Sequence, residues 1–270
     1  MYNNRLYIIE NITSLHVGSG DTNFGIIDNQ IQRDAITDYP TIHSSSLKGA
    51  LREYCNHKHN PNDGENFMAY IFGDEKNAGK IRFIDAHLLS VPMRSDTNPY
   101  YHCISPKSIE QLLEFSDNFN ITLEHKEALE RLSNYRGEDI VVKEGTPTIE
   151  DIKAKTNNSL DLSVLEPLIG SPIALVPNKQ FEELLKDLPV IARNQLENGE
   201  SKNLFYEEVL PRKSKLFTII SEPTYLYHED KKPLGNAFKR FNDYLIDDKD
   251  TIHIGANASI GYGVCTFKEL

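Results

Sequence analysis

The stretch that decides the fold of the first part of the chain is SSSLKGALREYCNH, residues 44–57. Its apolar side chains recur three and four residues apart, and serines, which are favoured at helix N-termini, stand at its start. The apolar positions are Leu47, Ala50, Leu51, Tyr54 and Cys55. We therefore predict a helix over about 45–57.

Strand-like and helical segments alternate on both sides of this helix. Runs rich in β-branched and aromatic residues predict strands, and Gly73 and Pro233 mark the end of one further helix and the start of another. The predicted strands are 6–17, 80–89, 216–226, 251–254 and 262–267, and the further helices are 67–72 and 233–246. Strand, helix, strand, insertion, strand, helix, strand is the order of an α+β, ferredoxin-like (RRM-like) fold.

Residues 106–189 differ from the rest of the chain in composition. Between 108 and 170, thirteen Asp and Glu stand against six Lys and Arg, a balance of −7 out of a net charge of −11 for the chain. The segment predicts helices at 106–115 and 178–188, with a polar stretch at 137–159. We interpret 106–189 as an acidic helical insertion.

A projecting hairpin follows the insertion. Strand-like runs at 190–196 and 202–209 flank Asn198-Gly199, and Asn-Gly is the favoured pair of a two-residue type I′ turn. The chain then divides into a ferredoxin-like body (1–105 and 206–270), the insertion (106–189) and the hairpin (190–209).

Composition excludes several classes of protein. With 270 residues, 39% hydrophobic and 26% charged, the chain reads as globular, and its apolar runs are far shorter than the roughly 20 residues of a membrane span. The N-terminus lacks the apolar region of a secretory signal, and three cysteines without a CxxC pattern predict neither a disulfide framework nor a zinc knuckle. We expect a cytoplasmic protein with no membrane partner.

Two segments have the chemistry of a phosphate-binding surface. At the start of the predicted helix, free amides, the serine hydroxyls and Lys48 converge as they do around bound phosphates, although an ordinary N-cap is the commoner use of such serines. The loop GANASIGYG, 255–263, would let a ligand approach its backbone closely, or simply connect two strands tightly. It is not a Walker loop, because no Gly-Lys-Ser/Thr follows.

Two other places carry groups that could take part in catalysis. His16 and Asp28 flank a glycine-rich loop, where a structural role is the commoner one for each residue type. Glu207 and Glu208 stand at the foot of the hairpin. Because adjacent strand residues point to opposite faces, one of the two at most faces any given site.

Taken in order, these segments resemble the RAMP superfamily of CRISPR effector proteins, and most closely the backbone ribonuclease subunit of the type III-B (Cmr) complex. The resemblance covers about 6–105 and 190–268. The matching motifs are LHVGSG (15–20), GIIDNQIQRD (25–34), SSSLKGALR (44–52), IFG (71–73), AGKIRFIDAHLL (78–89), VPMRS (91–95), FYEEVLP (205–211) and IGANASIGYG (254–263).

The resemblance implies a ferredoxin-like palm with a thumb hairpin, copies of which stack as a filament along a guide RNA and cut paired target RNA at regular intervals. Asp28 would be the catalytic carboxylate and would hold a divalent metal, Mg²⁺ or Mn²⁺, with His16 and Glu207 as supporting catalytic candidates. The implied RNA-binding residues are Ser44, Ser45, Ser46, Lys48, Arg52, Gly255, Asn257, Ser259, Gly261 and Gly263. The implied partners are guide RNA, target RNA, other RAMP subunits and the small subunit of the complex.

Three other functions remain open from the sequence. The chain could be the equivalent type III-A (Csm) subunit, although the Tyr-Glu-Glu-x-x-Pro segment and the Asn-Ala-Ser of the glycine loop favour type III-B. A non-catalytic RAMP scaffold is opposed by Asp28 in its GIIDNQIQRD context. A nucleotide-binding enzyme is opposed by the absence of a strand, GxGxxG and helix in that order.

Overall fold

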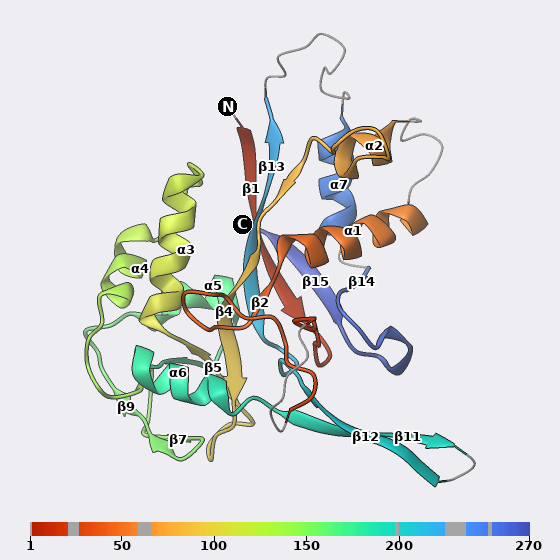
Figure 1. Cartoon of the computed structure of the whole chain (residues 1–270). Coiled ribbons are helices and arrows are strands. Elements are labelled where there is room, and N and C mark those ends of the chain that lie inside the picture. Colours follow the sequence, from red (N-terminus) through yellow and green to blue (C-terminus); the bar gives the residue numbers. More distant parts are fainter. Residues whose placement is uncertain (1, 21–26, 59–65, 198–199, 225–235, 248–249) are drawn as a thin grey trace.

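Strands from both ends of the chain lie side by side at the centre of one large mixed sheet (Figure 1). The computed structural model describes residues 2–20, 27–58, 66–197, 200–224, 236–247 and 250–270. Within these residues the strand order is β14 (Ile252–His253), β15 (Val264–Glu269), β1 (Tyr2–Asn11), β13 (Lys215–Pro223), β4 (Ala86–Met93), β5 (Tyr101–Ile104), β10 (Ile173–Leu175), β6 (Val141–Val142) and β9 (Lys155–Thr156). In addition, β2 (Thr41–Ile42) pairs with β4, and β3 (Arg82–Phe83) pairs with β13. The fold is mixed α/β.

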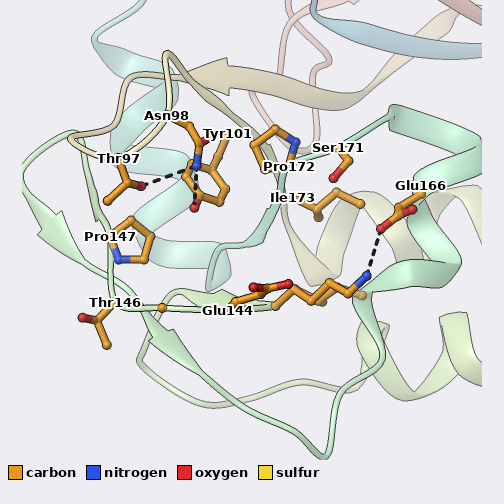
Figure 2. A pocket seen from close by; sticks show the side chains of 13 residues that line it. Thr97, Asn98, Tyr101, Glu144, Thr146, Pro147, Glu166, Ser171, Pro172 and Ile173 are labelled. Atoms are coloured by element: carbon orange, nitrogen blue, oxygen red, sulfur yellow. Dashed lines mark hydrogen bonds and ion pairs between the residues drawn. The ribbon is translucent and has the colours of Figure 1, made fainter.

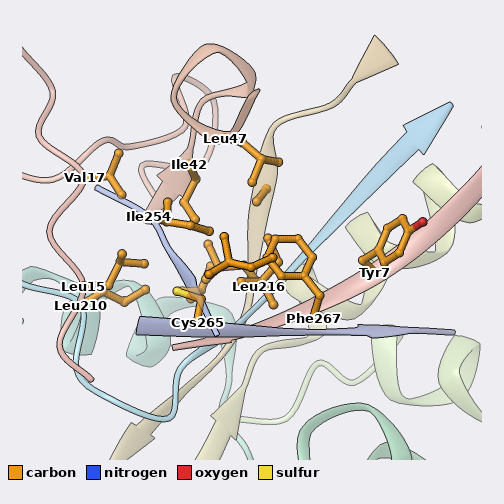
Figure 3. Close-up of a cluster of buried hydrophobic side chains, with 14 of the residues drawn as sticks. Tyr7, Leu15, Val17, Ile42, Leu47, Leu210, Leu216, Ile254, Cys265 and Phe267 are labelled. Atoms are coloured by element: carbon orange, nitrogen blue, oxygen red, sulfur yellow. The ribbon is translucent and has the colours of Figure 1, made fainter. Parts of the chain in front are cut away.

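The central strand β1 is buried on both faces of the sheet. Tyr7 and Ile9 belong to one hydrophobic core and Leu6 and Ile8 to the other, because successive side chains of a strand point to opposite faces. We call these the first and the second core; Figure 3 shows part of the first, with Tyr7 and Leu47 among its side chains. Strand β1 pairs antiparallel with β13 and β15, so both ends of the chain are needed to complete the sheet.

Different helices cover the two cores. The first core receives buried side chains from α1 (Ser44–Lys58), α2 (Phe67–Phe72), α6 (Asn178–Lys186) and α7 (Ala237–Leu245). The second core receives them from α3 (Pro106–Asn118), α4 (Lys126–Ser133), α5 (Glu166–Ile169) and the 3-10 helix η2 (Leu162–Leu165). The helix predicted over 45–57 is confirmed, with one more residue at each end, and its buried stripe is Leu47, Leu51 and Cys55.

The segment 106–189 contains strands as well as helices. Strands β6, β9 and β10 extend the main sheet beyond β5, and β7 (Thr148–Ile149) with β8 (Ile152–Lys153) forms a separate small sheet. The polar stretch 137–159 therefore contains four short strands. Each has only two residues, which is too short for an alternating pattern to be visible in the sequence.

The predicted hairpin is formed by two long strands that project away from the sheet (Figure 1). Strands β11 (Val190–Glu197) and β12 (Glu200–Glu208) pair antiparallel, with a register shift between Gln195 and Leu196. The Asn198-Gly199 turn lies outside the described residues. Part of the glycine-rich loop before Asp28, residues 21–26, and the expected helix start at Pro233 lie outside them as well.

Two predicted strands have wrong boundaries, for local reasons. The strand expected over 6–17 ends at Asn11, whose side-chain amide donates to the carbonyls of Thr13 and Pro211, each at 2.9 Å, and so fixes a turn. The strand expected over 80–89 is interrupted between β3 and β4. There the Asp85 carboxylate accepts a hydrogen bond from the Ser44 amide at the start of α1, at 2.7 Å.

Replacing Tyr7 by Phe tests the polar contact that closes the first core. The buried Tyr7 hydroxyl donates to Asn242 Oδ1, and Asn242 Nδ2 donates to Glu269 at 2.8 Å. Burial, helped by the Glu269 carboxylate, raises the pKa of Tyr7, so the hydroxyl stays protonated. We expect Tyr7→Phe to lower the free energy of unfolding by about 1–3 kcal/mol in denaturant titration, because Asn242 Oδ1 loses its donor.

The matched control is Tyr2→Phe on the same strand. The Tyr2 ring is exposed and lies 4.0 Å from the Arg82 guanidinium, a contact that Phe keeps. We expect a change within about 0.5 kcal/mol. Equal losses for the two variants would contradict the role given to the Tyr7 hydroxyl.

Candidate active site at the hairpin root

Asp28 lies beside the root of the hairpin, held there by strand β12. Its Oδ2 accepts a hydrogen bond from the Tyr206 amide at 2.8 Å. The neighbouring Asn29 pairs with the same strand, donating to Tyr206 O at 3.1 Å and accepting from the Glu208 amide at 2.9 Å. The Asp28 side chain is exposed, and its Oδ1 has no partner among the described residues. A fixed carboxylate with one free oxygen can bind a cation or a hydroxyl.

The Glu208 side chain fixes the loop that carries Asp28. This carboxylate is 3% exposed; its Oε2 accepts from the Ile31 amide at 3.1 Å, and its Oε1 pairs with Arg33. Arg33 also donates to the carbonyls of Asp38 and Leu185. Sequence reasoning considered Glu207 and Glu208 together and kept only Glu207 as a site residue, and it did not select Arg33. The available signal was strand alternation, which puts Glu208 on the face of β12 opposite Glu207.

Asp34 stabilises the next turn of the same loop. Its Oδ1 accepts from the amides of Ile36 and Thr37 and from the Thr37 hydroxyl. Burial opposes ionisation, but these hydrogen bonds outweigh it and hold the pKa of Asp34 below its ordinary value. The loop is thus held by the Glu208 carboxylate at Ile31 and by the Asp34 carboxylate at Ile36 and Thr37.

His16 and Glu207 lie together, but they are buried, at 4% and 5% exposure. His16 Nδ1 donates to the Glu208 carbonyl at 2.7 Å, and its Nε2 lies 3.9 Å from Glu207 Oε1. Glu207 Oε2 accepts from Asn257 Nδ2 at 3.1 Å and pairs with Arg193. Among the described residues, no hydrogen bond or ion pair joins either residue to Asp28. Of the three predicted catalytic residues, Asp28 alone presents its functional group to solvent.

The backbone and side chains at the start of α1 already make hydrogen bonds with other side chains of this chain. Besides the contact from Asp85 to the Ser44 amide, Gln32 accepts from the His43 amide at 2.8 Å and donates to Ser46 Oγ at 3.0 Å. The Ser44 amide and the Ser46 hydroxyl are therefore already bonded within the chain, whereas Ser45 is exposed.

The two predicted basic groups of α1 have different surroundings. Arg52 donates to the Gly73 carbonyl at 2.9 Å and so joins α1 to the end of α2. The half-buried Lys48 has no ion-pair or hydrogen-bond partner in the part of the chain that the structure describes. Within the described residues, Lys48 is therefore a cation of this helix that is free to meet a phosphate.

The glycine loop needs its glycines for two different reasons. Gly255 and Gly263 have positive φ, and a Cβ at either would lie within 2.3 Å or 2.0 Å of a carbonyl oxygen, that of His16 or of Ile254. At these two positions the tight-connection interpretation holds. Gly261 also has positive φ, but a Cβ there would meet no atom within 4 Å, and Ser259 is exposed. The outer part of the loop is therefore open to a ligand.

A groove of about 730 Å³ joins the two predicted RNA-binding segments. Ser46 and Gly49 line one side from α1, and Gly255 and Ala256 line the other from the glycine loop. Segments about 200 residues apart in the sequence thus share one surface. None of the predicted catalytic residues lines this groove.

A separate pocket of about 410 Å³ lies beside the 106–189 segment (Figure 2). Its polar groups are partly paired: Asn98 donates to the Tyr101 hydroxyl at 3.0 Å, and Lys143 pairs with Glu166 at 3.4 Å. The pocket contains no predicted site residue. It therefore gives no support to a site away from the hairpin root.

The described residues contain no group of three or more His, Cys, Asp or Glu side chains that could hold a metal ion. A Mg²⁺ ion keeps several of its waters and is commonly held by one or two carboxylates together with substrate phosphates. The exposed Asp28 carboxylate, with its free Oδ1, fits that type of site. All three cysteines are buried thiols, and no described helix is long and apolar enough to cross a membrane.

Two proteins of CRISPR systems are similar to this chain in sequence. CRISPR system Cmr endoribonuclease Cmr4 of Pyrococcus furiosus is 26% identical over 291 residues, covering 96% of this chain and 94% of that protein. Csm3 of Streptococcus thermophilus, a Cms endoribonuclease, is 34% identical over 88 residues, which is 28% of this chain.

Solved structures have the same fold over nearly the whole chain. A cryo-EM structure of type III-B Cmr-beta bound to cognate target RNA has a chain that superposes with a TM-score of 0.81 at 19% identity, covering 99% of this chain and 97% of that one. A crystal structure of oligomeric Cmr4 from P. furiosus superposes with a TM-score of 0.70 at 22% identity, covering 98% of each chain. The RAMP superfamily model matches residues 8–266, from the middle of β1 to β15, and the chain therefore belongs to the RAMP superfamily.

Proposed function

We propose that this chain is the guide-RNA-binding backbone subunit of a type III-B CRISPR effector complex and that it cleaves complementary target RNA at regular intervals. The observation that carries this proposal is the exposed Asp28 carboxylate, fixed at the root of a projecting hairpin. Support comes from the P. furiosus relative, an endoribonuclease matched along almost its whole length. The Csm3 relative matches little more than a quarter of this chain, which favours type III-B over type III-A.

The body of the molecule would be a ferredoxin-like palm formed by 1–105 and 206–270. The order β15, β1, β13, β4 is antiparallel throughout, with α1 before β4 and α7 before β15, which is the order expected of that fold. The hairpin 190–209 would be the thumb. The acidic insertion 106–189 would face away from RNA, where its negative charge does not oppose binding.

Guide RNA would lie along the groove between α1 and the glycine loop. Lys48 of α1, which is unpaired within the described residues, offers a charge for a phosphate, and Ser45, Ser259 and Gly261 offer exposed polar or small surface on the same two segments. An acidic chain can bind RNA in this way when its few basic groups share one face, because phosphate contacts act locally at physiological salt.

Asp28 would act on the target phosphodiester at the hairpin root. When bound there, a divalent ion such as Mg²⁺ or Mn²⁺ would neutralise charge that develops on the phosphate. The chain itself holds the carboxylate through Tyr206 and Asn29, and the hairpin would separate base pairs so that a ribose 2′-OH lies in line with the leaving oxygen. His16 and Glu207 would support this site from their buried positions.

The partners would be guide RNA, target RNA, further copies of this chain, other RAMP subunits and the small subunit of the complex. Self-association is supported by the oligomeric crystal structure of the P. furiosus relative. The three buried thiols fit a reducing cytoplasm.

Asp28→Asn tests the catalytic role directly. Asn keeps an oxygen that can accept from the Tyr206 amide, so the loop keeps its position while the charge is lost. We expect guide and target binding within about threefold of wild type and a cleavage rate at least about 100-fold lower, since charge stabilisation by a held metal contributes several kcal/mol. The measurement is single-turnover cleavage of an end-labelled target by the assembled complex.

The control for this variant is Asp117→Asn, which alters an exposed carboxylate paired with Lys126 on the insertion. It should cut at the wild-type rate. If Asp28→Asn lost target binding in parallel with cleavage, Asp28 would be a structural residue, and the catalytic assignment would be wrong.

Lys48→Ala tests the guide-binding groove. We expect weaker guide binding with no sequence preference, and a plot of log affinity against log salt with a slope reduced by about one, as for the loss of one phosphate contact. Lys126→Ala, which removes an exposed lysine paired with Asp117, is the matched control and should leave the slope unchanged. An unchanged slope for Lys48→Ala would reduce the start of α1 to an ordinary helix cap.

A further inference from the structure

The face of β12 away from Arg33 carries a polar cluster at the hairpin root. We call it the root clamp; its members are His16, Arg193, Glu207, Asn257 and Tyr262. The Glu207 carboxylate is its centre, accepting from Asn257 Nδ2 at 3.1 Å and pairing with Arg193 Nε. The Arg193 guanidinium lies 4.8 Å from the centroid of the Tyr262 ring. The cluster thus joins both strands of the hairpin to the glycine loop.

The contacts of the root clamp are strengthened by burial. The side chains of Glu207 and Arg193 are 7% and 18% exposed, so their charges are screened little by water or salt. Arg193 Nη2 is buried and makes no hydrogen bond within the described residues. The Arg193 guanidinium is therefore held by its ion pair with the Glu207 carboxylate and by its contact with the Tyr262 ring. This arrangement is suited to holding two segments together and poorly suited to direct contact with RNA.

Three successive residues of β12 connect the clamp to Asp28. The Tyr206 amide holds the Asp28 carboxylate, Glu207 belongs to the clamp, and Glu208 binds the loop at Ile31 and Arg33. A shift of β12 relative to the glycine loop must therefore also shift the Asp28 carboxylate. The hairpin has no hydrophobic core of its own that would oppose such a shift: within the described residues, the side chains of β12 from Glu200 to Leu204 are exposed.

We propose that Arg193 is a positioning residue for RNA cleavage: through Glu207 it fixes β12 against the glycine loop and so sets the place of Asp28. The loop that would hold guide RNA and the carboxylate that would cut target RNA are then aligned by one buried ion pair. Because this inference rests on the proposed function, its test includes a measurement that does not depend on cleavage.

The first measurement is cleavage by complexes assembled with Arg193→Met, which has a flexible apolar side chain without charge. We expect target affinity within about threefold of wild type and a single-turnover rate at saturating target about tenfold to 100-fold lower, as for a catalytic group displaced by about 1 Å. Tyr262→Leu, which removes the ring against which the guanidinium packs, should resemble Arg193→Met. Arg94→Met is the matched control, since Arg94 is an 87% exposed arginine paired with Glu150.

A double-mutant cycle distinguishes action through Glu207 from direct contact with RNA. If Arg193 acts through Glu207, the variant with both Arg193→Met and Glu207→Gln should cut no more slowly than the slower single variant. Losses that multiply in the double variant would overturn the proposal. If Arg193→Met does not assemble, Arg193→Lys keeps the charge without the flat stacking group, and the cycle is run with that variant.

The second measurement is amide hydrogen exchange of the isolated chain. The amides of Tyr206 and Glu208 bond to Asp28 and Asn29, so loosening of the clamp should speed their exchange about tenfold or more in Arg193→Met but not in Arg94→Met. Faster exchange in the isolated Arg193→Met chain, together with a wild-type complex that never cuts target, would refute the proposed function and retain the clamp. If Arg193→Met exchanged these amides and cleaved target at wild-type rates, the role given to the clamp would be overturned, while the proposed function would stand.

Discussion

Strand β1 has to be covered on both faces, and the architecture follows from that requirement. Its buried run Leu6–Ile9 sends alternate side chains into two cores, so helices must lie on each side of the sheet. On one side, α1, α2 and α7 come from the two ends of the chain and α6 from the insertion, whereas the helices on the other side, α3, α4 and α5, all come from the insertion. The 106–189 segment is therefore part of the folded core as well as the acidic surface.

The hairpin is not held in place by a hydrophobic core in this way, because it extends beyond both cores. Its orientation depends on polar contacts at the root, where Glu207 and Glu208 leave β12 on opposite faces. Both carboxylates are buried; Glu207 pairs with Arg193, and Glu208 pairs with Arg33. Removing either arginine would be costly, because it would leave an uncompensated charge in the interior. The exposed Asp28 carboxylate is thus supported by two ion pairs whose carboxylates are buried.

Short sequence patterns predicted the helices and strands that form from local interactions. The stripe of Leu47, Leu51 and Cys55 was sufficient for helix α1, and Asn198-Gly199 was sufficient to place the two hairpin strands on either side. Strands of two residues in the insertion carry no periodicity, so their pairing depends on neighbours distant in sequence. The sequence indicated Asp28 and Glu207 as candidates but could not show that one is exposed and the other buried. Arg193 carries no sequence signal at all, because its role exists only where β11 meets the glycine loop.

The pairing of β1 also governs the time course of folding during synthesis. This strand leaves the ribosome first, yet its partners begin at Lys215 and Val264. At about 5–20 residues per second, roughly 10–40 s pass between the completion of β1 and the first appearance of β13. Throughout that interval β1 has two unpaired edges, which are templates for pairing with other chains. A nascent chain of this topology therefore depends on protection of β1 until β13 and β15 have been synthesised.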